Sequence, residues 1–233
     1  MNIFNKKLLF FYSVLFLSLL VACGGDPTEP VDLPPEPTQP TAEPNGVAAE
    51  TITILAFGDS LTAGFGVDEA ENYPSQLEAK LLADGYQVEV INGGVSGETS
   101  SGGLTRLDWM LTSEPDIVIV ETGGNDGLRG VELDETRDNI DQIVGGFSAE
   151  AIVIVAGMQI VQNLGEEYTT EFAAIYPAVA ERHDAILIPF FLEGVAADPD
   201  LNQADFIHPT AEGYTVVVDH IYPFVLDALS RLE

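Results

Sequence analysis

Short apolar runs alternate with helix-like patterns from about residue 51 to the end of the chain. Four of the runs are rich in Ile and Val and continuously apolar, which is typical of strands buried on both faces of a parallel sheet. A fifth run alternates polar and apolar residues, which predicts a half-exposed strand near a sheet edge. The continuous runs are residues 52–57, 117–120, 151–156 and 185–188, and the alternating run is residues 87–90.

Between these runs, apolar residues recur at the three- and four-residue spacing of one helix face. We expect Asp134 to cap the third helix, Pro177 to disturb the fourth, and Pro223 to kink the last, which begins near Thr210. The helical patterns cover residues 74–84, 104–111, 134–147, 172–179 and 210–229.

The resulting order is a strand followed by a helix, repeated five times. This order predicts an α/β fold, a doubly wound parallel sheet with helices on both faces. Residues 51–233 are enough to bury a sizeable core as one domain. Ligands of such sheets bind beyond the carboxyl ends of the strands, so polar residues directly after each strand are the candidates for chemistry.

Several polar or glycine-rich segments stand at those positions. Ser60 follows the first predicted strand, Gly97 the second and Asn125 the third, and Asp205 and His208 follow the fifth. Each also has a structural interpretation: serine caps helices, Asn and Asp form turns, and a neutral His can lie in a surface turn. Because all these segments share one edge of the sheet, we expect their side chains to lie close together.

Together these residues are the parts that ester hydrolysis requires. Ser60 would attack an acyl carbon, His208 would take its proton and return it to the leaving group, and Asp205 would stabilise the imidazolium. The N–H groups of Ser60 and Gly97 and the side chain of Asn125 would bind the oxyanion.

At these residues the chain resembles the GDSL or SGNH hydrolase family, over about residues 51–229. The family's blocks occur in order as residues 58–61, a segment around Gly97, residues 123–126 and residues 205–208. The resemblance implies a flavodoxin-like three-layer α/β/α fold with a five-stranded parallel sheet. It also implies the same Ser-His-Asp triad and oxyanion donors, with no metal and no cofactor.

Within the family, the chain is most similar to the branch of bacterial acyl-CoA thioesterases, lysophospholipases and arylesterases. This similarity rests on further stretches at 123–130, 158–160, 174–177 and 189–191. It implies hydrolysis of carboxylic esters and thioesters, with aryl or short to medium acyl esters, lysophospholipids and acyl-CoA as substrates. Two alternatives stay open: a carbohydrate acetylesterase of the same family, and a catalytically silent envelope lipoprotein.

The charge of the chain narrows the choice of partners. Eight Lys and Arg stand against 38 Asp and Glu, a formal net charge of −30, while 46% of the residues are hydrophobic, as in a globular protein. Phosphates would be repelled, so nucleic-acid binding is excluded. The self-repulsion suggests adaptation to salt, which screens it. We expect a monomer.

The two other histidines, His183 and His220, fall in predicted helices and are interpreted as structural.

The first 50 residues differ from the rest. Lys6 and Lys7 precede a 14-residue apolar run, shorter than the roughly 20 residues of a spanning helix, and the only cysteine, Cys23, follows it. We predict a lipoprotein signal peptide (1–22), a lipidated Cys23 followed by a Pro- and acid-rich tether (23–50), and a hydrolase domain (51–233). The alternative is an ordinary secretory signal or a short anchor, with the cysteine incidental.

This N-terminal pattern predicts an exported bacterial lipoprotein of the cell envelope, on the periplasmic side of the outer membrane if the host is Gram-negative. Removal of the signal peptide removes two lysines and no acid, so the net charge becomes −32. Anionic headgroups would repel such a surface. Membrane attachment is therefore expected through the lipid on Cys23 rather than through charge.

Overall fold

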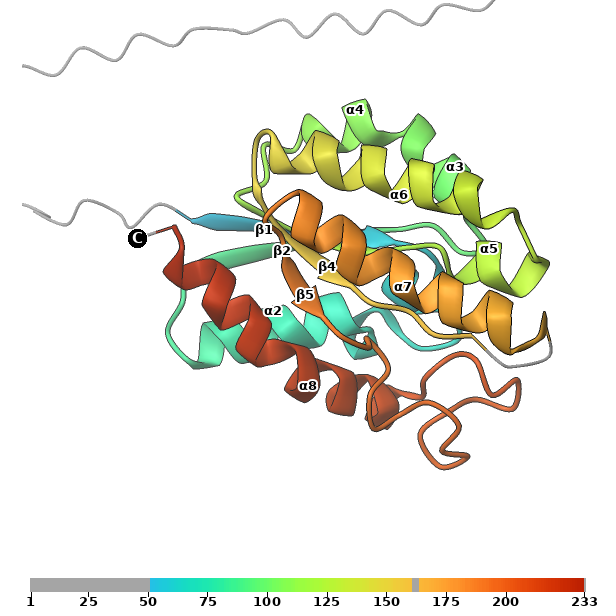
Figure 1. Cartoon of the computed structure of the whole chain (residues 1–233). Helices are drawn as coiled ribbons and strands as arrows, with labels where there is room; N and C mark the ends of the chain where they lie inside the picture. The colour runs from blue at the N-terminus through green and yellow to red at the C-terminus, as the bar shows by residue number, and fades with distance from the viewer. Residues whose placement is uncertain (1–50, 161–163, 233) are drawn as a thin grey trace, which may run out of the picture. The chain divides into compact units, whose positions relative to one another are not determined.

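The structure, a computed structural model, describes residues 51–160 and 164–232. Five parallel strands form one sheet in the order β2-β1-β3-β4-β5 (Figure 1). This is the flavodoxin-like order, so the predicted fold class is confirmed. The strands are β1 (Ile52–Gly58), β2 (Val88–Gly94), β3 (Ile117–Glu121), β4 (Ile152–Ala156) and β5 (Ile186–Ile188).

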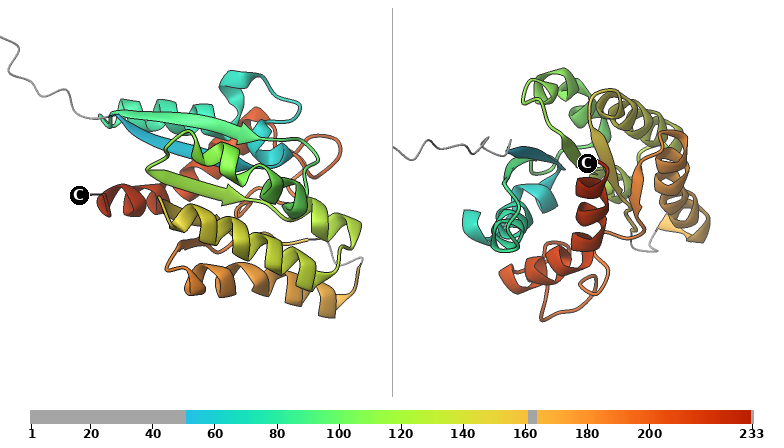
Figure 2. Two further views of the ribbon diagram at one scale, coloured as in Figure 1. Left: turned by 90° about the horizontal axis from the view of Figure 1, so that it is seen from above. Right: turned by 90° about the vertical axis from the view of Figure 1, so that its left-hand side faces the viewer.

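Helices cover both faces of the sheet, which gives three layers (Figures 1 and 2). Short helices follow the carboxyl ends of β1 and β3. One face carries α3 (Ser100–Thr105), α4 (Leu107–Leu111), α6 (Leu133–Ser148) and α7 (Glu166–Arg182), and the other carries α2 (Tyr73–Ala83) and α8 (Ala211–Ser230). The short elements are α1 (Ser60–Ala63), the 3-10 helix η1 (Glu69–Glu71) and α5 (Gly124–Arg129).

The strands are buried as their composition predicts. Every residue of β3 is buried, as are the last five of β1 and the last four of β4. In β2, by contrast, buried and exposed residues are mixed, and this strand lies at the edge of the sheet as expected. Continuous apolarity therefore identified the three central strands, whereas β5, from the fourth continuous run, lies at the other edge of the sheet with Leu187 only partly buried.

The helix details differ from the expectations in three places. Glu132, not Asp134, is the N-cap of α6. Asp134 lies in the first turn, where its negative charge interacts favourably with the helix dipole. The predicted second helix breaks at Arg106 into α3 and α4. Pro177 lies inside a continuous α7, because the buried face of this helix outweighs one lost backbone hydrogen bond. Helix α8 also continues through Pro223, and the expected kink there stays a prediction.

The register of the sheet brings the candidate segments together. Gly58, the last residue of β1, pairs with Gly94 at the end of β2 and with Glu121 at the end of β3. The segments that follow these three strands therefore leave the sheet side by side. Among the residues described, no helix is both long and apolar enough to cross a membrane. The predicted signal peptide, Cys23 and the predicted tether lie outside the described residues.

Candidate active site

Ser60 is the first residue of α1, directly after the turn that ends β1. Asp59 is the N-cap of this helix, and its Oδ1 accepts the Leu61 N–H at 3.0 Å. The Ser60 residue is 8% exposed. The strand-turn-helix therefore holds the hydroxyl at the carboxyl edge of the sheet with little freedom to move.

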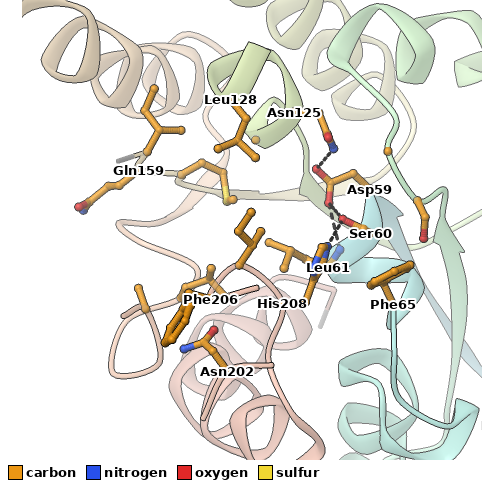
Figure 3. A pocket seen from close by; sticks show the side chains of 18 of the residues that line it. Asp59, Ser60, Leu61, Phe65, Asn125, Leu128, Gln159, Asn202, Phe206 and His208 are labelled. Carbon is orange, nitrogen blue, oxygen red and sulfur yellow. Dashed lines mark hydrogen bonds between the residues drawn. The ribbon is translucent and has the colours of Figure 1, made fainter. Parts of the chain in front are cut away.

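His208 and Asp205 reach Ser60 from the loop between β5 and α8. The Nε2 of His208 lies 2.8 Å from Ser60 Oγ (Figure 3). Its Nδ1 lies 2.7 Å from Asp205 Oδ2. The structure thus brings the three predicted residues into one hydrogen-bonded chain. An aromatic contact supports the imidazole, since the Phe65 ring lies 4.7 Å from it between centroids.

A tight local turn sets the Asp205 carboxylate. Its Oδ1 accepts the N–H groups of Ile207 at 3.0 Å and His208 at 3.1 Å, and Phe206 within the turn has a positive φ of 59°. Partial burial by itself would raise the pKa of Asp205. The hydrogen bonds from the His208 ring and the two N–H groups outweigh that effect and lower the pKa to about 2. Asp205 is therefore charged at any working pH.

The three predicted oxyanion donors face the same edge. In residues 51–160 and 164–232, the N–H groups of Ser60 and Gly97 donate to no protein acceptor. Gly97 has a φ of +80°, a conformation that glycine adopts without strain. Asn125 Nδ2 donates to Asp59 Oδ2 at 2.9 Å, which orients the amide and leaves its second N–H available.

Polar contacts join the loops that carry these donors. Asp59 and Asn125 link the first loop to the third, as above. Ser100, at the start of α3, donates its N–H and its hydroxyl to Asp126 at 2.8 and 2.6 Å, and this links the second loop to the third. Ser100 and Asp126 are 0% and 1% exposed. Buried ties of this kind keep the oxyanion donors at fixed separations.

A second carboxyl group lies beneath the nucleophile. Glu121 is 0% exposed, and its Oε2 accepts the Asp59 N–H at 3.2 Å and the Thr62 hydroxyl at 2.8 Å. Burial, together with the charge of Asp59, raises the pKa of Glu121 well above its ordinary value. Gly58 makes this approach possible, because a Cβ there would collide with Thr62 Oγ1 and with Glu121.

An apolar cavity opens beside Ser60 with a volume of about 770 Å³ (Figure 3). Its walls come from α1, α5 and the segments that follow β1, β2, β4 and β5. Most of the residues in these walls are apolar. They include Phe65, Leu128, Met158, Ile160, Phe190, Leu192, Phe206 and Ile207.

The remaining histidines lie elsewhere, as predicted. His183 caps the end of α7 and its Nε2 contacts Asp141 Oδ1 at 2.9 Å, while His220 Nε2 contacts the Phe190 carbonyl at 2.9 Å. In the described part of the chain, no three His, Cys, Asp or Glu side chains form a group that could hold a metal ion.

Sequence reasoning missed the residues that support the donors. Asp59 and Asp126 lie inside the blocks 58–61 and 123–126, and Glu121 directly follows the predicted strand 117–120, but none of the three received a role. One signal was available: Glu121 continues an apolar run that predicts burial on both faces, and it is the buried last residue of β3. For Ser100 and Asp126 no pattern in the sequence indicated the pairing.

Comparison with known proteins agrees with this geometry. The GDSL-like lipase/acylhydrolase family matches residues 56–216. Esterase TesA of Pseudomonas aeruginosa is 38% identical over 75% of this chain and 88% of its own. The thioesterase 1/protease 1/lysophospholipase L1 of Escherichia coli K12 is 37% identical over 74% and 82%. The crystal structure of AlinE4, an SGNH-hydrolase family esterase, has a TM-score of 0.65 and 46% identity over 77% of this chain and 97% of its own. The chain belongs to the GDSL-like lipase/acylhydrolase family.

Proposed function

We propose that this protein is a serine hydrolase of carboxylic esters and thioesters that works through an acyl-enzyme. The observation that carries the proposal is the hydrogen-bonded chain from Ser60 through His208 to Asp205 at the mouth of an apolar cavity. Nucleophile, base and orienting carboxylate stand in the order that this chemistry requires.

In the first half of the reaction, Ser60 Oγ attacks the acyl carbon while its proton moves to His208 Nε2. The oxyanion that forms accepts hydrogen bonds from the N–H groups of Ser60 and Gly97 and from Asn125. Collapse of this intermediate breaks the bond to the leaving group, and the leaving oxygen or sulfur takes the proton from His208 Nε2. Asp205 stabilises the imidazolium while it exists.

In the second half, a water molecule attacks the acyl carbon of the acyl-enzyme and gives a proton to His208. The second tetrahedral intermediate then collapses, the bond to Ser60 Oγ breaks, and the proton on His208 returns to that oxygen. The carboxylic acid leaves and the resting enzyme is restored. His208 therefore acts once as base and once as acid in each half.

The cavity supports acyl chains as the group that is bound. Its apolar walls suit the alkyl part of an aryl ester, a lysophospholipid or an acyl thioester, classes that the names of the relatives include. An acetylated carbohydrate would leave these walls uncovered, which disfavours the acetylesterase alternative. Rates on acetylated glycans and on medium-chain esters separate the two.

Replacement of Ser60 by Ala tests the proposal. We expect turnover of p-nitrophenyl acyl esters to fall to the background of the uncatalysed reaction, with the protein still folded. Ser230→Ala, the same change on the exposed end of α8, is the matched control and retains full activity. Undiminished turnover by folded Ser60→Ala protein would rule out the proposal and leave the silent lipoprotein.

We further propose that residues 1–22 are a lipoprotein signal peptide, that Cys23 carries the lipid, and that residues 23–50 tether the domain to the envelope. The proposal rests on the charged and apolar pattern before the only cysteine of the chain. In a bacterial host, the protein fractionates with membranes, and Cys23→Ser moves it to the soluble fraction. Unchanged fractionation of the Cys23→Ser variant would contradict lipidation.

A further inference from the structure

A largely buried ion pair lies between the loops that carry two of the proposed oxyanion donors. Arg106 Nε lies 2.9 Å from both carboxylate oxygens of Glu98, and Arg106 Nη2 lies 2.6 Å from Glu98 Oε2. The two side chains are only 13% and 11% exposed. Such a forked arrangement fixes both partners in direction as well as distance.

The same guanidinium also reaches the end of β1. Its Nη2 donates to the Gly58 carbonyl oxygen at 3.1 Å, and its Cζ lies 4.0 Å from the centroid of the buried Phe57 ring. The Gly58 carbonyl also accepts the Val95 N–H at 2.9 Å. Arg106 is therefore held from three sides: by a carboxylate, a carbonyl and an aromatic face.

The contacts of Arg106 bracket the proposed oxyanion hole. Glu98 directly follows Gly97, and Gly58 stands two residues before Ser60. The Gly97 and Ser60 N–H groups are the two backbone donors. Glu98 anchors the Gly97 segment through its pair with Arg106, and Arg129 Nη2 also donates to the Gly97 carbonyl oxygen at 2.9 Å. Arg106 itself does not line the cavity, so it acts on the substrate only through these two segments.

We propose that Arg106 and Glu98 are positioning residues of the reaction, which set the separation of the Ser60 and Gly97 N–H groups so that both meet one oxyanion. This inference rests on the proposed esterase function. It assigns a catalytic consequence to an ion pair that otherwise appears as part of the packing between α3, α4 and the sheet. Lysine would not serve, because one ammonium cannot reach the carboxylate as a fork and the Gly58 carbonyl together.

The substitution Arg106→Lys tests the inference. It keeps the charge and most of the volume but loses the fork. We expect kcat to fall by roughly 10- to 100-fold with KM within about threefold, since misplacement of a donor weakens only the transition state. Arg182→Lys is the matched control: Arg182 pairs with Asp141 at 2.9 Å at the end of α7, on the opposite edge of the sheet, and we expect it to leave kcat unchanged.

A second measurement separates positioning from general destabilisation. A trifluoromethyl ketone that forms a tetrahedral adduct with Ser60 uses the oxyanion hole, whereas a fatty acid product uses only the cavity. In Arg106→Lys we expect the inhibition constant of the ketone to rise by the same factor by which kcat/KM falls, while fatty acid binding stays unchanged. A merely structural pair would change both affinities or neither.

Each outcome decides the inference. Equal kcat in Arg106→Lys and Arg182→Lys, or a raised KM at constant kcat, overturns it. Should Arg106→Lys not fold, Glu98→Gln, which keeps an acceptor but loses the charge, is judged by the same ratio of ketone to fatty acid affinity. Hydrolysis that survives Ser60→Ala would instead overturn the proposed function, so the two failures are distinguishable.

Discussion

At the scale of single residues, the pKa values of two carboxyl groups of this site are shifted in opposite directions. Hydrogen bonds keep the pKa of Asp205 at about 2, while burial raises the pKa of Glu121 well above its ordinary value. Asp205 therefore faces the imidazole as a carboxylate, and Glu121, under the nucleophile, keeps its proton to a higher pH than an ordinary glutamate does. The two pKa shifts differ because of hydrogen-bond donors and solvent exposure: the Asp205 side chain is more than a third exposed, and Glu121 is not exposed at all.

Asp205→Asn tests the charged member of this pair. Asparagine can still accept the N–H groups of Ile207 and His208, so the turn is kept, but it no longer stabilises an imidazolium. We expect kcat to fall by about 10⁴-fold with little change in stability. Because the pKa of Asp205 is about 2, titration of this group does not affect the rate between pH 5 and pH 9. A loss under tenfold would contradict its role.

Glu121→Gln tests the group whose pKa is raised. A carboxyl group whose pKa is raised on folding binds a proton that the unfolded chain releases once the pH exceeds the ordinary value of 4.5. The free energy of unfolding of the wild type therefore declines as pH rises from that value toward the raised pKa. Glutamine has no proton to lose, so this part of the decline is absent from the variant.

Urea unfolding of both proteins at pH 4.5, 6 and 7.5 measures the effect. We expect the stability of Glu121→Gln relative to the wild type to increase with pH across this series, because all other titrating groups are common to both. A difference that does not vary with pH would show that Glu121 is ionised in the folded protein.

At the scale of elements, the site depends on the close approach of three strand ends. Gly94 at the end of β2 packs against the backbone of α1, so that a Cβ there would collide with the Thr62 and Ala63 main chain. Backbone cannot move aside as a side chain can. Small residues at the ends of β1 and β2 are therefore a condition for placing Ser60 next to Gly97.

We expect Gly94→Ala to lower the free energy of unfolding by more than the ~1–3 kcal/mol that is typical of an overpacked core. We also expect it to lower kcat, because the added methyl group pushes α1 away from β2. Gly85→Ala is the control: nothing lies within 4 Å of its Cβ, so its positive φ of 94° is the only source of strain. Thermal unfolding and ester turnover of both variants check this. Equal effects of the two changes would contradict the close-approach account.

Elements were also the level at which the sequence was most informative. Four continuous apolar runs located β1, β3, β4 and β5, and alternation located β2 at one edge, because burial on one or two faces leaves a local pattern. The five predicted site residues, Ser60 among them, came together because strand ends share one edge. The pairing of Ser100 with Asp126 and of Arg106 with Glu98 depends on helix placement, which no local pattern encodes. The observed cap of α6, Glu132, lies two residues before the predicted cap, Asp134, since acidic residues crowd the first turn of this helix.

At the scale of the whole molecule, acidity dominates. Six of the 38 acidic residues and two of the eight basic ones precede residue 51, which leaves a formal net charge of −26 on residues 51–233. Five of the six basic side chains of this segment are in ion pairs with carboxylates, so the excess negative charge is uncompensated at the surface. Repulsion among these charges opposes the compact state and is reduced by screening.

Salt should therefore stabilise the domain. We expect the midpoint of thermal unfolding to rise steadily from 0.05 to 1 M NaCl, a range over which the Debye length shortens from above ~10 Å to ~3 Å. The rise should be steepest at the low end of this range. Differential scanning calorimetry of residues 51–233 and of the full chain measures this. A midpoint that is unchanged or lower at 1 M NaCl would contradict adaptation to salt.

The central claim, that Ser60 is the nucleophile of an ester hydrolase, is tested most directly by covalent labelling. A fluorophosphonate forms a bond with an activated serine, and mass spectrometry of the intact protein and its peptides locates the adduct. The account predicts one adduct per chain, on the peptide that contains Ser60, formed at the same rate as ester hydrolysis is lost and abolished in His208→Ala. Loss of hydrolysis without an adduct on Ser60, or labelling of Ser60 that leaves hydrolysis intact, would contradict it.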